Sequence, residues 1–153
     1  IIANDFISKK YQIKLAAHKE SEGFLKHAKE YGINFGIQLD EIKPIDIFIS
    51  EEDAIKFGHS ELQILYTPGH ADGSLCFYAN DEGFVITGDV LFFQSIGRTD
   101  LPTGNYDLLQ ESIREKLFKL PEKTTVYPGH GPETNIGYEK IHNPFVAVGK
   151  DLL

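Results

Sequence analysis

The fold is decided by residues 62–89, which read LQILYTPGHADGSLCFYANDEGFVITGD. Here and just upstream, short apolar runs bounded by turn residues predict four strands in a row, at residues 55–57, 62–66, 75–79 and 84–87. The last two flank Asn80-Asp81-Glu82-Gly83, which predicts a hairpin turn because Asn, Asp and Gly tolerate positive φ. A second tight turn is expected at Gly58-His59-Ser60.

Helices are expected before and after these strands in the sequence. Residues 107–120 carry apolar side chains at helical spacing, at Leu109, Ile113, Leu117 and Leu120. Two more helices are predicted over residues 3–11 and 21–31, with Gly32 ending the second. A short strand is predicted at residues 124–127, and residues 33–53 are expected to be irregular. The mixture predicts an α/β architecture.

The composition excludes several classes of protein. With 153 residues, 41% of them hydrophobic, the chain fits a single domain over residues 1–153. No run approaches the roughly 18 apolar residues that a membrane span needs. A net charge of -8 without a cluster of Lys and Arg argues against a nucleic-acid partner. The single Cys76 cannot form an internal disulfide and no signal peptide opens the chain, so a cytoplasmic location is expected.

Three polar side chains follow predicted strands directly after turn-forming residues. They are His70 in Thr67-Pro68-Gly69-His70, Asp89 in Thr87-Gly88-Asp89 and His130 in Tyr127-Pro128-Gly129-His130. Each turn lifts a side chain from the edge of the sheet, so two imidazoles and a carboxylate are able to converge. Such a set suits zinc, manganese or iron. The other histidines and the cysteine are expected to be structural: His18, His27, His59, His142 and Cys76.

These motifs resemble the metal motifs of the metallo-β-lactamase superfamily. In order, residues 67–70 resemble its third motif, 84–89 its fourth and 126–131 its fifth. Residues 92–102 and His142-Asn143-Pro144-Phe145 are similar to the glyoxalase II-like hydrolases within that superfamily. The resemblance implies an αββα sandwich with a metal site at one edge between its two sheets. This chain resembles the second half of that sandwich.

The resemblance also implies a role for each side chain. His70 would bind a first metal, Asp89 would bridge two metals, and His130 would bind the second. Zinc is the expected cofactor, as one or two ions, with iron or manganese as alternatives. Asp89 would be catalytic because it holds the metal-bound hydroxide, and Arg98 would bind substrate. For Arg98, an internal ion pair with Asp100 stays open as the alternative.

One signature of the superfamily is absent from the sequence. No His-x-His-x-Asp-His string exists here, which removes two ligands from each metal. Because residues 1–12 resemble the helix after that loop, we expect the missing ligands just before Ile1. A degenerate, metal-free relative is the alternative. As written, the chain is expected to be incomplete and to pair with an upstream half of the same domain or with itself.

The implied activity is hydrolysis of a small-molecule thioester resembling lactoylglutathione. Two other functions stay open. A mononuclear iron persulfide dioxygenase is one, because its relatives share the string Gly97-Arg98-Thr99-Asp100, and a non-catalytic interaction module is the other. Metal identity separates the hydrolase from the dioxygenase, and absence of metal from the full-length protein would favour the module. No membrane or nucleic-acid partner is expected.

Overall fold

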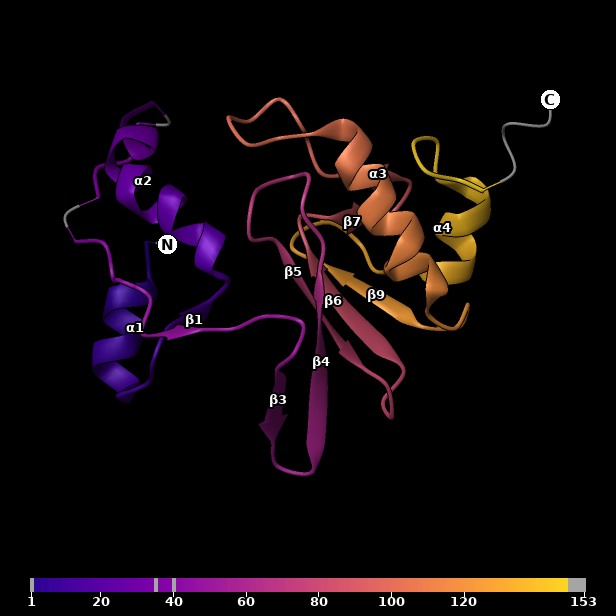
Figure 1. Cartoon of the computed structure of the whole chain (residues 1–153), viewed down its shortest axis with the longest axis horizontal. Helices are drawn as coiled ribbons and strands as arrows, with labels where there is room; N and C mark the ends of the chain where they lie inside the picture. Colours follow the sequence, from indigo (N-terminus) through magenta and orange to yellow (C-terminus); the bar gives the residue numbers. More distant parts are fainter. Residues whose placement is uncertain (1, 35, 40, 149–153) are drawn as a thin grey trace. The chain divides into compact units, whose positions relative to one another are not determined.

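A computed structural model describes residues 2–34, 36–39 and 41–148 (Figure 1). The chain divides into two compact units, residues 1–49 and 50–153, and each is described by itself. Within the described residues, no helix combines the length and the apolar character needed to cross a membrane. The single domain expected from chain length stays a prediction.

The first unit contains two helices and a pair of very short strands. Its elements are α1 (Asn4–Tyr11), β1 (Ala16–Ala17), the 3-10 turn η1 (Lys19–Ser21), α2 (Glu22–Asn34) and β2 (Ile47–Phe48). Strands β1 and β2 pair in parallel, and Asp46 steadies this pairing because its carboxylate accepts the Leu15 N–H at 2.7 Å. Hydrogen bonds from Lys43 and from that amide lower the pKa of Asp46.

The predicted end of the second helix at Gly32 is wrong, because α2 continues to Asn34. Glycine inside a helix costs only about 1 kcal/mol relative to alanine, so it does not by itself stop one. Here a Cβ at Gly32 would lie 2.7 Å from the carbonyl oxygen of Ile37. The glycine therefore serves a close approach of the backbone rather than a helix end. The predicted helix over residues 3–11 is confirmed as α1.

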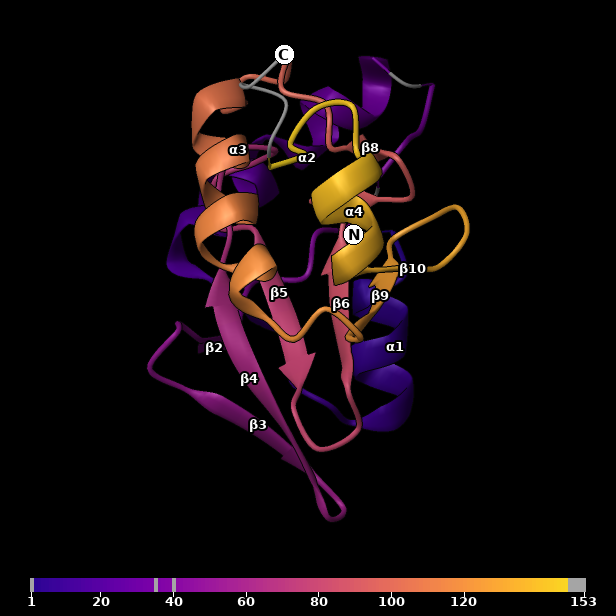
Figure 2. The same cartoon turned by 90° about the vertical axis from the view of Figure 1, so that its right-hand side faces the viewer.

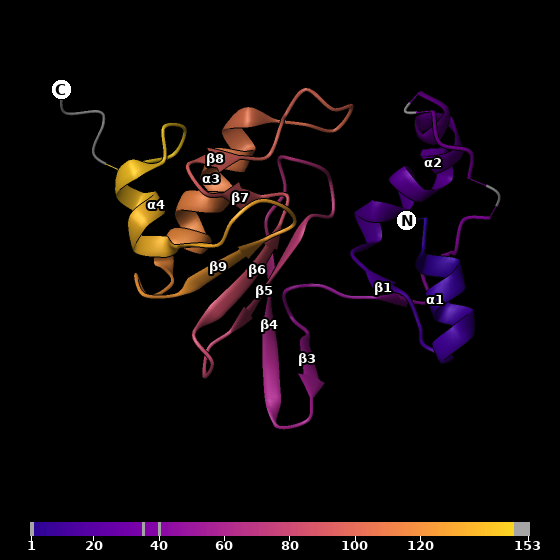
Figure 3. The same ribbon diagram turned by 180° about the vertical axis from the view of Figure 1, so that it is seen from behind.

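The second unit is built on one six-stranded sheet. Its strands are β3 (Ala54–Phe57), β4 (Ser60–Tyr66), β5 (Leu75–Ala79), β6 (Phe84–Gly88), β9 (Thr125–Pro128) and β10 (Thr134–Asn135). They lie in the order β10-β9-β6-β5-β4-β3, and Figure 3 labels β9, β6, β5, β4 and β3 one after another across the sheet. The four strands predicted in the middle of the chain are confirmed, as is the short strand near residues 124–127.

The directions of the strands bring the ends of three of them to one end of the sheet. Strand β5 runs antiparallel to both β4 and β6, so β4 and β6 point the same way. Strand β9 pairs with β6 in parallel. Therefore β4, β6 and β9 all end at the same end of the sheet, although other segments separate them in the sequence.

Helices cover one face of this sheet (Figure 2). They are α3 (Tyr106–Glu115), the 3-10 turn η2 (Leu117–Lys119) and α4 (Ile136–His142). In the core, Leu109 and Ile113 of α3 and Ile136 of α4 pack with Val85 and Val126 of the sheet, and all five are fully buried. On the opposite face, the paired residues Ile86 and Tyr127 are 41% and 43% exposed.

Two expectations for the helices need correction. The helix predicted over residues 107–120 is divided, because α3 ends at Glu115 and η2 follows. The tighter turn lets the neighbours Leu117 and Phe118 both enter the core. Helix α4 lies outside the predicted elements. It has only 7 residues, and its buried face includes Glu139, so its hydrophobic periodicity is weak.

Candidate functional site

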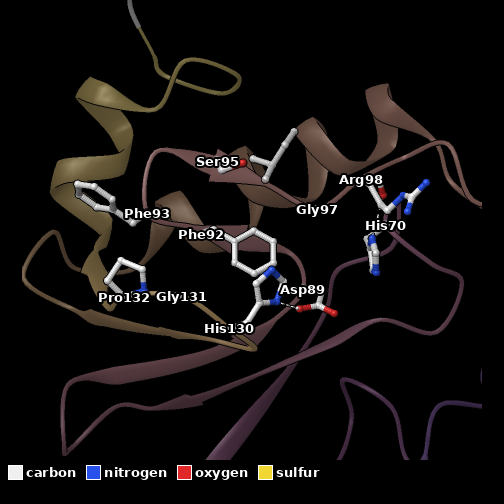
Figure 4. Close-up of a pocket in the computed structure, with 11 residues that line it drawn as sticks. His70, Asp89, Phe92, Phe93, Ser95, Gly97, Arg98, His130, Gly131 and Pro132 are labelled. Carbon is white, nitrogen blue, oxygen red and sulfur yellow. Dashed lines mark hydrogen bonds and ion pairs between the residues drawn. The ribbon is translucent and has the colours of Figure 1, made fainter. Parts of the chain in front are cut away.

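A pocket of about 390 Å³ lies at the end of the sheet where β4, β6 and β9 finish (Figure 4). The four residues predicted to form the site, His70, Asp89, Arg98 and His130, all line it. The rest of the lining comes from Phe92, Phe93, Ser95, Ile96, Gly97, Gly131 and Pro132. The structure therefore brings together side chains that are up to 60 residues apart in the sequence (130 minus 70).

The turn before His70 is held against the start of α3. Gly69 has φ +125°, and a Cβ there would lie 2.3 Å from the backbone nitrogen of Leu109. The Asn105 N–H donates to the Gly69 carbonyl at 2.8 Å. His70 Nδ1 lies 2.8 Å from the carbonyl oxygen of Arg98. Because a carbonyl only accepts, Nδ1 donates, and the neutral ring keeps its lone pair on Nε2.

The turns that carry Asp89 and His130 fit into one another. The Gly129 N–H donates to the Gly88 carbonyl at 2.7 Å, and Asp89 Oδ1 lies 3.1 Å from His130 Nδ1. A Cβ at Gly129 would lie 2.6 Å from Asp89 Oδ1, so glycine at this position makes room for the carboxylate. In the neutral ring of His130, donation from Nδ1 again leaves Nε2 as the free acceptor.

The side chains of His70, Asp89 and His130 are of the types that bind metal ions of intermediate softness. Two imidazole Nε2 atoms and a carboxylate are ligands that zinc, iron and manganese accept. Asp89 and His130 touch, whereas His70 lines the same pocket and contacts Arg98 instead. In the part of the chain that the structure describes, no three His, Cys, Asp or Glu side chains gather closely enough to hold an ion. The ligand roles of His70, Asp89 and His130 stay predictions.

Arg98 makes the ion pair that the sequence left open. Its Nε and Nη2 atoms donate to the two carboxylate oxygens of Asp100, each at 2.7 Å. This contact lowers the pKa of Asp100 to about 2 and raises that of Arg98. Both side chains are more than half exposed, so the pair lies in solvent at the rim of the pocket. A role for Arg98 toward substrate stays a prediction.

Two aromatic side chains of the pocket, Phe92 and Phe93, are not among the predicted site residues, although they belong to the stretch that resembles glyoxalase II-like hydrolases. They belong to a hairpin of β7 (Leu91–Phe92) and β8 (Ser95–Ile96). The ring centroids of Phe92 and His130 lie 4.5 Å apart, and Phe93 stacks on Tyr138 with 5.3 Å between the ring centroids. The turn residues Phe93 and Gln94 are not the Gly or Asn that mark a two-residue hairpin, so periodicity and turn chemistry do not find it.

Three of the residues expected to be structural, Cys76, His18 and His142, make contacts within the protein. Cys76 is fully buried in β5, which raises its pKa to about 12 and keeps it protonated. His18 is buried and caps η1 by accepting from the Glu20 N–H. The ring of His142 lies 4.6 Å from that of Tyr138, beside the stack that includes Phe93. For Cys76 and His18 the expectation is confirmed.

Comparison with known proteins identifies the family. Residues 1–130 match the Metallo-beta-lactamase superfamily. The chain belongs to the metallo-β-lactamase superfamily. Its fold agrees with that of the crystal structure of BLEG-1 B3 metallo-β-lactamase, with a TM-score of 0.88 and 38% identity over 97% of this chain and 72% of that one. The resemblance inferred from the three strand-end motifs, and the α/β sandwich fold that it implied, are therefore confirmed.

Two curated members of the superfamily are similar in sequence. The chain is 42% identical to the probable metallo-hydrolase YqgX of Bacillus subtilis, over 94% of this chain and 69% of that protein. It is 36% identical to the hydroxyacylglutathione hydrolase GloC of Haemophilus influenzae, over 89% of this chain and 65% of that protein. The chain thus spans about two thirds of the length of these two relatives.

Proposed function

We propose that this member of the metallo-β-lactamase superfamily is a metal-dependent hydrolase of a thioester resembling hydroxyacylglutathione. The observation that carries the proposal is the convergence of His70, Asp89 and His130 on one pocket at the end of the sheet. Further support comes from similarity to proteins named metallo-hydrolase and hydroxyacylglutathione hydrolase.

The proposed metal ligands are His70, Asp89 and His130, with zinc as the first choice and iron or manganese as alternatives. A bound ion lowers the pKa of water toward 7 and polarises the carbonyl that is attacked. The contribution of Asp89 is to orient the attacking water and accept its proton. One of its carboxylate oxygens, Oδ1, contacts His130, and the lone pairs that remain on the two oxygens are available for this role and for an ion.

The rest of the pocket is proposed to bind the two ends of the substrate. Phe92, Phe93 and Ile96 supply an apolar wall against which an acyl group or a thiol carrier packs. Arg98 lies at the rim, where its guanidinium would bind a carboxylate of the carrier. Asp100 competes for the same guanidinium, because it already forms two hydrogen bonds with it.

The proposal is tested with the purified full-length protein after elemental analysis. Thiol release from lactoylglutathione is followed, with a β-lactam as comparison substrate because the fold also matches a B3 metallo-β-lactamase. We expect thiol release that His70→Ala lowers by at least about 100-fold. His59→Ala is the matched control, since this exposed histidine lies in the turn between β3 and β4. Absence of thiol release, or full activity of His70→Ala, would overturn the proposal.

A persulfide dioxygenase is the second candidate, favoured by the Gly97-Arg98-Thr99-Asp100 string at the pocket rim. The same preparation separates the two. One iron per chain with oxygen consumption on glutathione persulfide supports the dioxygenase, whereas zinc with thiol release supports the hydrolase. Full-length protein that holds no metal and turns over neither substrate would support the interaction module.

A further inference from the structure

A buried carboxylate outside the proposed metal ligands contacts the β7–β8 hairpin, whose residues line the pocket. Glu139 of α4 is fully buried, and its oxygens accept hydrogen bonds from the Thr134 hydroxyl at 2.6 Å and the Asn143 amide at 2.7 Å. The backbone N–H of Gln94 donates to the same carboxylate, 3.1 Å and 3.3 Å from its two oxygens. A buried carboxylate that meets only neutral donors costs free energy of folding, and an apolar side chain would fill the same space without that cost.

The Gln94 backbone is strained where Glu139 holds it. Gln94 has φ +52° at the second turn position between β7 and β8, where Gly or Asn is usual. Such a conformation persists only when surrounding contacts over-determine it. Here the carboxylate holds the backbone N–H, and the Gln94 side-chain amide donates to the Tyr138 hydroxyl. Helix α4 therefore fixes the turn from two sides.

The second strand of the hairpin is anchored through the same carboxylate. The fully buried Asn143 donates to the carbonyl oxygen of Ser95 at 3.1 Å while it also donates to Glu139. Ser95 follows Gln94 directly, so both contacts act on neighbouring residues of one hairpin. Removing Glu139 would take the acceptor from the Gln94 N–H and one of the two acceptors that orient the Asn143 amide.

This hairpin forms one wall of the pocket. Phe92 and Phe93 line the pocket, and the Phe92 ring packs on His130 (Figure 4). We propose that Glu139 is a positioning residue of this site: by holding Gln94 and Asn143 it fixes the β7–β8 hairpin, and through Phe92 it fixes the ring of His130. Its expected effect on turnover rests on the proposed function, whereas its effect on the hairpin does not.

Two substitutions at position 139 separate hydrogen bonding from shape. Glu139→Met keeps a long side chain but leaves the Gln94 N–H and the Asn143 amide without their acceptor. Glu139→Gln keeps one oxygen for those two donors, while its new amide donates to the Thr134 hydroxyl, which also accepts. The Gln variant is therefore expected to behave as the wild type and the Met variant is not.

The first readout is amide hydrogen exchange of Gln94, measured relative to the amides of the central strand β5. We expect Glu139→Met to accelerate this exchange by at least about tenfold and to shift the side-chain resonances of His130. The second readout is thioester turnover, where KM should rise by about tenfold because the apolar wall is loosened. Glu139→Gln should stay within about twofold of the wild type in both readouts.

Ile113→Ala is the matched control, because it opens a cavity in the same core under α3 but removes no hydrogen bond to the hairpin. The proposal is overturned if Glu139→Met leaves the Gln94 amide protected. It is also overturned if Ile113→Ala raises the exchange rate of Gln94, relative to the β5 amides, as much as Glu139→Met does. If Glu139→Met does not fold, Thr134→Val is combined with Glu139→Gln, because the new amide then loses its acceptor at position 134 and no longer holds the remaining oxygen in place for Gln94. This double variant should accelerate Gln94 exchange more than either change alone, and equal exchange would overturn the proposal. If the wild type releases no thiol, the proposed function fails while the exchange experiment still decides this proposal.

Discussion

Asp89 occupies a special position among the polar residues of the pocket. Its carboxylate directly follows β6, it touches His130, and Gly129 leaves space for it. In Figure 4 it lies between His130 and His70. A carboxylate in this place has two oxygens, so it is able to contact two ions and offset their mutual repulsion. A single imidazole Nε2 contacts only one.

Asp89→Ala is therefore expected to lower metal content more than His70→Ala or His130→Ala does. We predict the loss of most bound metal from the full-length protein, measured by elemental analysis after dialysis. Asp81→Ala, in the exposed turn between β5 and β6, is the control and should keep its metal. Retention of two ions with normal turnover in Asp89→Ala would show that the bridging role is wrong.

Substitutions of Arg98 and Asp100 are expected to change KM in opposite directions. If Arg98 binds a carboxylate of the substrate, Arg98→Ala should raise KM by about tenfold with little change in kcat, which is the signature of lost uniform binding. Asp100→Asn should then lower KM, because it frees the guanidinium. A purely structural ion pair would instead make both variants worse to a similar degree.

The pH dependence of this effect follows from the pKa of Asp100. Its pKa in the folded protein is lowered to about 2, so the ion pair forms above that value and is lost only as the pH falls through it. The difference in KM between Asp100→Asn and the wild type should therefore be constant from about pH 5 to pH 8. If this difference in KM disappears between about pH 5 and pH 8, the ion pair between Arg98 and Asp100 is not its cause.

At the scale of elements, the site depends on how closely its turns pack. Gly97 follows β8, and its N–H donates to the Val90 carbonyl at 3.2 Å. A Cβ at Gly97 would lie 2.1 Å from the Asp89 carbonyl oxygen and 3.0 Å from His70 Cβ. The loop after β8 therefore approaches two strand-end turns at once, and only glycine permits the approach.

Gly97→Ala is expected to push these turns apart. We predict a loss of about 1–3 kcal/mol of unfolding free energy in urea denaturation, together with weaker metal binding, because the neighbours are backbone and cannot move freely. Gly23→Ala is the matched control: no atom lies within 4 Å of its added Cβ, and it lies in α2. That change should be neutral or stabilise by up to about 1 kcal/mol. Equal unfolding curves for Gly97→Ala and the wild type would refute the packing argument.

At the scale of the whole molecule, the number of donors limits what residues 1–153 do alone. The pocket offers two imidazoles and one carboxylate, and in the described residues no three candidate ligands cluster closely. A catalytic zinc usually has three protein ligands of its own. Two ions that share three donors would therefore be under-coordinated.

We accordingly predict that isolated residues 1–153 bind metal weakly and hydrolyse thioester poorly. Cobalt titration followed by its visible spectrum measures the affinity, and gel filtration with light scattering measures association through the sheet face that carries Ile86 and Tyr127. The full-length protein is the control. Two tightly bound ions with normal turnover in a monomer of residues 1–153 would defeat this prediction.

Local patterns in the sequence determined much of the fold and part of the site. The four central strands, the helix around Leu109 and Ile113, and the strand-end placement of His70, Asp89 and His130 all follow from turn residues and periodicity over a few positions. Their physical basis is local, because φ preferences and alternation act between near neighbours in the chain. For the same reason the family resemblance was visible in short motifs.

Only the tertiary structure decided which of these residues meet. The shared direction of β4, β6 and β9 depends on sheet order, so the sequence alone did not show that Asp89 contacts His130 while His70 contacts Arg98. The burial of Glu139 has no local signal, since a carboxylate in a short helix is usually exposed. Its partner Gln94 lies 45 residues away, and contacts over such distances are set by how helices pack on the sheet rather than by any short pattern.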